Sequence, residues 1–111
     1  MVIDRAIEDT LRRLSVRQLE ALVEFIPTGE RTGDYISVDS LNNSIHTADD
    51  NKKKIIGGVL SGLSKVKIND QPIILPAGRD EKEGMRWVLN TKVITREQLK
   101  DVLWEIPGLN L

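Results

Sequence analysis

Three segments indicate the fold of this chain: YISVDSLNNSI (residues 35–45), KKKIIGGVLSGLSKV (52–66) and GRDEKEGMRWVLN (78–90). The first of them predicts a short strand at residues 35–37, followed by a helix from about residue 38 to 45. Leu41 and Ile45 are four residues apart, so a helix places both on one face. This segment therefore reads as a strand that leads into a short helix.

A second helix is predicted from about residue 47 to 64. Thr47, with Asp50 three residues later, resembles a capping box at its start. The spacing i, i+3, i+4, i+7 that defines one apolar helical face is met by Ile56, Val59, Leu60 and Leu63. This is the strongest periodicity in the chain.

Three short apolar segments follow, at residues 66–68, 72–75 and 85–89, and each predicts a strand. The last two are separated by a polar connection, residues 78–84, which begins and ends with glycine. The pattern indicates a β-hairpin.

The order of strand, short helix, second helix and hairpin resembles the winged helix-turn-helix superfamily of DNA-binding domains, over roughly half of the 111 residues. The resemblance implies an α+β fold, mostly α, with a small antiparallel hairpin as the wing. It also implies that the second helix enters the major groove while the wing touches the DNA backbone or minor groove.

Additional helices flank this region. An apolar face runs along residues 3–14, Ser15 with Gln18 predicts a capping box that opens a helix to about residue 26, and Thr95 with Gln98 predicts another. We expect one domain over 1–111, with N-terminal helices in 1–30, the winged core in 35–90 and a C-terminal helix at 95–106, where Trp104 widens the apolar stripe. The first segment fits two helices or one bent helix.

The apolar faces of the terminal helices allow two interpretations. They could pair two copies of the chain into a homodimer, as a reader of palindromic DNA requires, or they could complete the core of one copy. The core of a small domain is limited, so one copy has little room to bury two further apolar faces. This favours the homodimer.

Charge is distributed unevenly along the chain. The net charge is −1, yet residues 52–86 hold eight Lys or Arg against four Asp or Glu, a local net charge of +4. DNA affinity comes largely from the neutralisation of phosphates, so the basic segment is the candidate interface. Lys52, Lys53 and Lys54 lie where the dipole of the second helix disfavours cations. Phosphate contact would explain their position, and the alternative is that they form a solvated helix face.

The candidate DNA-binding residues come from the second helix, the segment after it and the hairpin. They are Asn51, Lys52, Lys53, Lys54, Gly58, Ser61, Lys65, Lys67, Arg79, Lys82 and Arg86. Trp87 alternates with Arg86 and is expected in the core. Asp80, Glu81 and Glu83 would repel phosphate, so the wing could also lie away from DNA.

Three glycines lie in the second helix, where each costs up to about 1 kcal/mol relative to alanine. Close approach to DNA would explain Gly58, and close packing against another helix would explain Gly57 and Gly62 equally well. Both explanations stay open at the level of the sequence.

Other function classes find little support. The chain has no cysteine and one histidine, it lacks common catalytic motifs, and no cofactor is implied. We expect a cytoplasmic DNA-binding regulator that is not an enzyme. The alternative is a winged-helix protein interaction module within a larger assembly, and it is favoured by the near-neutral net charge and the acidic wing tip.

Overall fold

The computed structural model describes residues 5–27, 33–41, 52–82 and 84–109. It is an α+β structure with two small antiparallel hairpin sheets, so the mixed fold class is confirmed. None of the helices in the described part of the chain is long and apolar enough to cross a membrane.

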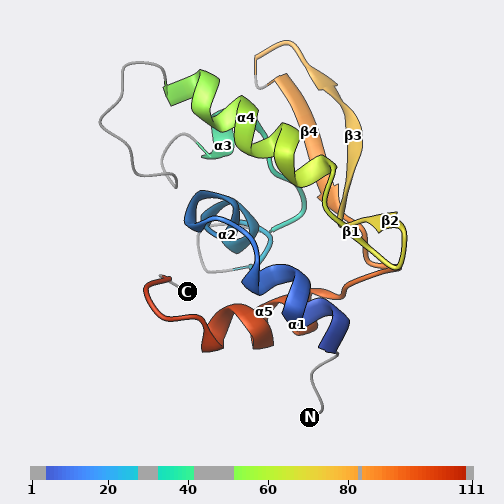
Figure 1. Ribbon diagram of the computed structural model, residues 1–111. Helices are drawn as coiled ribbons and strands as arrows, with labels where there is room; N and C mark the ends of the chain where they lie inside the picture. The colour runs from blue at the N-terminus through green and yellow to red at the C-terminus, as the bar shows by residue number, and fades with distance from the viewer. Residues whose placement is uncertain (1–4, 28–32, 42–51, 83, 110–111) are drawn as a thin grey trace.

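The elements follow one another in an order close to the predicted one (Figure 1). The helices are α1 (Arg5–Arg12), α2 (Val16–Val23), α3 (Val38–Leu41), α4 (Lys52–Ser64) and α5 (Arg96–Glu105). The strands are β1 (Lys67–Ile68), β2 (Gln71–Pro72), β3 (Ile74–Asp80) and β4 (Gly84–Leu89).

The N-terminal segment forms two helices, and both predicted capping boxes at described helix starts are confirmed. The Ser15 hydroxyl accepts a hydrogen bond from the backbone N–H of Gln18, whose side chain accepts one from the backbone N–H of Ser15. Thr95 and Gln98 make the same reciprocal pair at the start of α5. These bonds satisfy amide groups that a helix start otherwise leaves unpaired.

The core lies between the helices and the inner ends of the strands. Helices α1 and α5 lie together at one end, and α2 lies between them and α4 (Figure 1). The apolar faces of both terminal helices are buried in this core through Ile7, Leu11, Leu99, Val102 and Leu103. The described chain therefore uses both faces to complete its own core.

Residues 35–37 do not form a full strand as predicted. Only Ile36 pairs, through an antiparallel bridge to Trp87 with two backbone hydrogen bonds of 2.8 Å. The chain turns into α3 immediately afterwards, because Ser37 and Ser40 exchange hydrogen bonds between their hydroxyls and backbone N–H groups. The end of this helix and the predicted start of the next, residues 42–51, lie outside the described residues.

The predicted strand at 72–75 is wrong as a single element. Pro72 belongs to β2, which pairs with β1 across the turn residues Asn69 and Asp70, both with positive φ. The buried Asn90 lies where the chain passes from β2 to β3: its side-chain N–H donates to Pro72 O at 2.8 Å and its backbone N–H donates to Ile73 O at 2.9 Å. The chain is thereby divided between two hairpins at Ile73.

The second hairpin is longer than predicted. Strand β3 continues to Asp80 and β4 begins at Gly84, so the turn is shorter than the glycine-bounded connection of the prediction. A shift in register between Pro76 and Arg79 contains Gly78, whose φ of 108° is a conformation that favours glycine. The outer half of the hairpin extends beside α4, away from the core (Figure 1).

Candidate nucleic-acid interface

Helix α4 turns its apolar face inward and a small, polar face outward. The spacing-predicted Ile56, Val59, Leu60 and Leu63 are all buried, and Gly58, Ser61 and Lys65 are exposed, as expected. Asn51 lies outside the described residues. The backbone of Lys52, Lys53 and Lys54 is helical, and their side chains also lie outside the described part of the chain.

The glycines of α4 have different surroundings. A Cβ added to Gly62 would lie 3.0 Å from Nε2 of Gln18, so this glycine allows α2 and α4 to pack closely. A Cβ added to Gly57 or Gly58 would meet nothing within 4 Å. Packing between described residues therefore explains why position 62 holds a glycine. It does not explain the glycines at positions 57 and 58.

A shallow, open groove runs between the start of α2 and the middle of α4. Its lining residues are Ser15, Arg17, Gln18, Ile55, Gly58 and Val59. Arg17 is exposed and was not among the predicted site residues. No local signal marks it, since its place beside α4 follows from the packing of the two helices.

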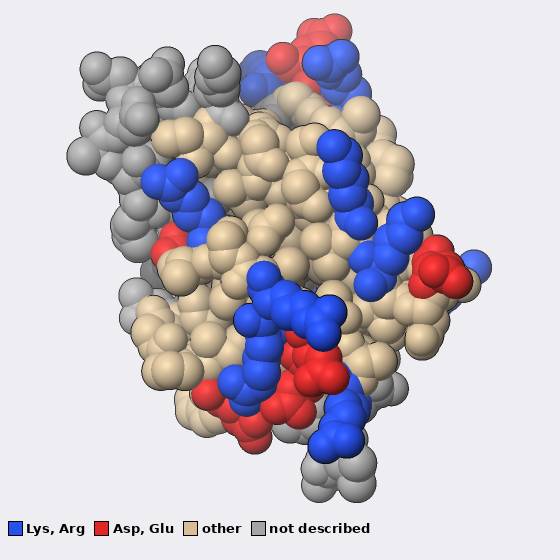
Figure 2. All heavy atoms as spheres, viewed as in Figure 1, with Lys and Arg blue, Asp and Glu red and all other residues tan. Residues whose placement is uncertain are grey.

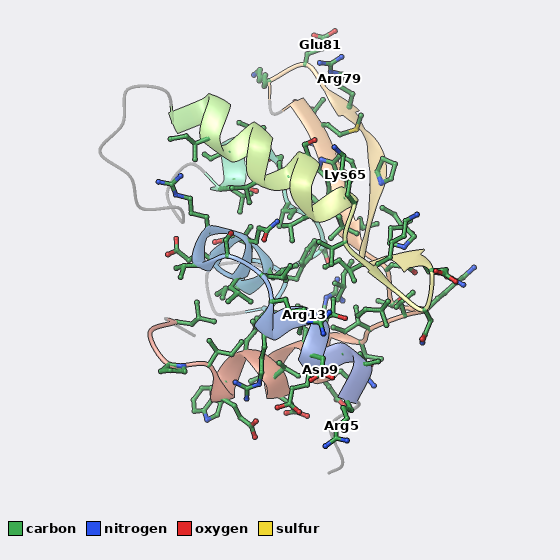
Figure 3. All side chains as sticks on the ribbon, in the orientation of Figure 1. Arg5, Asp9, Arg13, Lys65, Arg79 and Glu81 are labelled. Carbon is green, nitrogen blue, oxygen red and sulfur yellow. The ribbon has the colours of Figure 1, made fainter. Side chains whose placement is uncertain are left out.

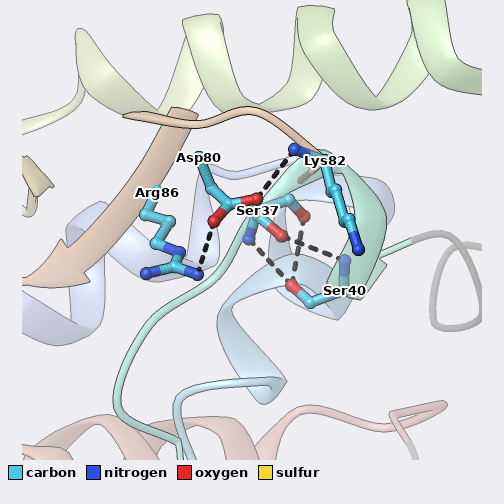
Figure 4. Close-up of polar contacts among 5 residues, drawn as sticks. All are labelled: Ser37, Ser40, Asp80, Lys82 and Arg86. Carbon is cyan, nitrogen blue, oxygen red and sulfur yellow. Dashed lines mark hydrogen bonds and ion pairs between the residues drawn. The ribbon is translucent and has the colours of Figure 1, made fainter. Parts of the chain in front are cut away.

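The tip of the β3–β4 hairpin carries both signs of charge (Figure 3). Arg79, Glu81 and Lys82 are exposed. Asp80 is turned back into the hairpin: one carboxylate oxygen accepts the backbone N–H of Lys82 at 2.8 Å, and the other pairs with Nη2 of Arg86 at 3.3 Å (Figure 4). Part of the acidic tip that the sequence indicated is therefore neutralised within the hairpin.

Arg86 is held against the sheet. Besides its ion pair with Asp80, its guanidinium lies 4.7 Å from the ring centroid of Tyr35, within the range of a cation–π contact. Its side chain keeps 37% of its exposure. Of the predicted hairpin cations, Arg79 and Lys82 are thus the more accessible, and Arg86 anchors the hairpin to the segment before α3.

The basic residues near α4 share one face of the molecule. Lys65 follows α4, and Lys67 is exposed on β1. Figure 2 shows Lys and Arg side chains spread from the hairpin tip across the surface over α4 and α2, while most Asp and Glu side chains in view gather at the tip, at the right-hand edge and around α1 and α5. Lys65 directly follows α4 (Figure 3), and Arg17 lines the groove beside this helix, so the fold brings both cations close to α4.

The two tryptophans have different environments. Trp87 is half-buried, packs against the core and carries the bridge to Ile36, as expected of a core residue. Trp104 keeps 70% of its surface exposed on α5, outside the stripe that the sequence predicted it would widen. It is an unusual residue to leave open to solvent.

Neither metal chemistry nor known relatives assign an activity. The described residues contain no group of three or more His, Cys, Asp or Glu side chains placed to hold a metal ion. Comparisons with protein-family models, curated proteins and solved structures found no match to this chain.

Proposed function

We propose that the protein is a DNA-binding transcriptional regulator of the winged helix-turn-helix class, which inserts α4 into the major groove. The order of elements supports this proposal: α2, the bridging Ile36, α3, α4 and, after the short β1–β2 hairpin, the β3–β4 hairpin. Ile36 and Pro76 both pair with Trp87, so β4 lies between Ile36 and β3. The isolated bridge at Ile36 thus lies beside the two-stranded β3–β4 sheet, in the position of the strand that precedes the helix pair in the proposed class.

The observation that carries the proposal is the pair of glycines at 57 and 58. Each lowers helix stability by up to about 1 kcal/mol relative to alanine. Among the described residues, neither has a neighbour that an added Cβ would touch within 4 Å. A helix surface without side chains lets its backbone approach a ligand closely, and the wall of a DNA groove is such a ligand.

Length and charge are compatible with this role. Helix α4 has 13 residues, which corresponds to about 20 Å, and the major groove is about 12 Å wide. Lysines lie at both ends of the helix, at 52–54 and at 65. Cations at both ends can reach phosphates on either side of the groove while Gly58 and Ser61 face the bases.

The direct test is fluorescence anisotropy of a labelled mixed-sequence duplex at about 50 and 200 mM salt, where phosphate-driven affinity falls steeply. Replacement of Lys52, Lys53 and Lys54 by alanine is expected to weaken binding to every duplex and to lower the salt dependence by up to about three phosphate contacts. A matched control replaces Arg5, Lys92 and Lys100, which are exposed on or near the terminal helices. Equal losses in both triple variants would contradict a site on α4.

A second candidate function is a protein interaction module within a larger assembly, and one observation favours it. Trp104 is exposed on α5, and exposed aromatic side chains often anchor protein interfaces. The same anisotropy titration separates the two functions, because an interaction module would not bind the duplex even at low salt.

A further inference from the structure

The groove between α2 and α4 contains a charged residue, Arg17, that makes no polar contact within the described part of the chain. Arg17 lies in the first turn of α2 and is exposed. It makes no hydrogen bond or ion pair to any residue that the structure describes. The cost of keeping a guanidinium in this position is low because water reaches it, yet nothing inside the described fold explains its place.

The polar groups of Ser15 and Gln18, which also line the groove, already bond to each other. The Ser15 hydroxyl accepts the N–H of Gln18, and the carboxamide oxygen of Gln18 accepts the N–H of Ser15 at 2.9 Å. Oε2 of Glu20, one turn after Arg17, is buried without a hydrogen-bond partner among the described residues, and Glu20 does not line the groove. The positive charge of Arg17 is therefore what the groove offers a ligand, rather than free amide groups at the helix start.

The opposite wall of the groove is low. It consists of Ile55, Gly58 and Val59 from α4, and Gly58 adds no side chain that would close it. Close packing of the two helices at Gly62 and Gln18 fixes the distance between the walls. A narrow anionic chain can therefore lie along α4 and reach Arg17.

We propose that this groove holds the sugar–phosphate backbone of one DNA strand, with Arg17 bound to a phosphate. The inference rests on the proposed function, since a helix in the major groove has a backbone along each flank. Helix α2 lies along one flank of α4, and the β3–β4 hairpin lies along the other (Figure 1). Arg17 then contacts one strand, and Arg79 and Lys82 of the hairpin are placed toward the other.

The experiment compares Arg17→Ala, Arg17→Lys and Arg5→Ala in the duplex titration, over a series of salt concentrations. Arg5 is the matched control, because it is also an exposed arginine but lies at the far end of α1 from α4 (Figure 3). Arg17→Ala is expected to make the negative slope of log K against log salt shallower by about 0.9, the value for one phosphate contact. Arg17→Lys is expected to keep most of the slope, and Arg5→Ala all of it.

The outcomes separate the inference from the function on which it rests. No binding by the wild-type chain, even at low salt, overturns the proposed function itself. Wild-type binding with equal slopes for Arg17→Ala and Arg5→Ala leaves that function standing and overturns the groove contact. A change in sedimentation coefficient for Arg17→Ala, without a change in slope, assigns the groove to a second copy of the chain and also overturns the contact.

Discussion

At the scale of single residues, two glycines on α4 differ in the space around them, so replacement by alanine should affect stability differently at each. A Cβ added to Gly58 would meet no described atom within 4 Å, whereas one added to Gly62 would meet Gln18. We expect Gly58→Ala to raise the free energy of unfolding by about 1 kcal/mol, the difference in helix propensity. Urea denaturation followed by circular dichroism measures this change.

Gly62→Ala is the matched control for that substitution. Its new methyl group would lie 3.0 Å from Nε2 of Gln18. Gln18 would have to move, and its movement weakens the hydrogen bond with which it caps α2. The gain in helix propensity is then offset by about 1 kcal/mol. Equal stabilisation by the two substitutions would contradict the packing role of Gly62.

At the scale of elements, the β3–β4 hairpin tests whether the wing approaches DNA. Asp80→Asn keeps an oxygen for the backbone N–H of Lys82 and removes the charge that pairs with Arg86. If the wing lies near phosphate, we expect duplex binding to tighten several-fold at low salt and by less at high salt. Anisotropy titrations measure this difference.

Asp9→Asn is the control for Asp80→Asn. Asp9 is exposed on α1, far from the hairpin (Figure 3), and its replacement changes the net charge by the same amount. No change with Asp80→Asn would mean that the wing lies away from the duplex. The Asp80–Arg86 pair is partly exposed on both sides, so its loss should cost less than about 1 kcal/mol of stability.

At the scale of the whole molecule, the question is how two copies could pair. The apolar faces of α1 and α5 are buried within one chain, so the homodimer expected from the sequence would have to use the surface left outside. Trp104 is the largest apolar side chain there. We expect Trp104→Glu to shift a dimer toward monomer in sedimentation velocity, with little loss of stability because the side chain is mostly in water.

Val16→Glu is the matched control, since Val16 is 63% exposed on α2. It should leave the sedimentation coefficient unchanged. A wild-type chain that sediments as a monomer at every concentration would contradict the homodimer, and DNA binding would then take place through single copies.

The sequence by itself determined the features that depend on neighbouring residues. The inward face of α4 follows from the spacing of its apolar residues, and the starts of α2 and α5 follow from pairs three residues apart, such as Ser15 and Gln18. Helix geometry brings such residues together wherever the helix lies. These features were therefore predictable without any knowledge of packing.

Which distant segments meet could be learned from the folded chain alone. Pro72 and Asn90 divide a stretch that reads as one strand, Ile36 pairs with Trp87, and Arg17 lines the same groove as Gly58. The position of α2 likewise distinguishes Gly62, which packs against Gln18, from Gly57 and Gly58, where an added Cβ would meet no described atom within 4 Å. Such contacts depend on how the whole core packs, because a local pattern fixes which face of an element is apolar and leaves open which other element covers it.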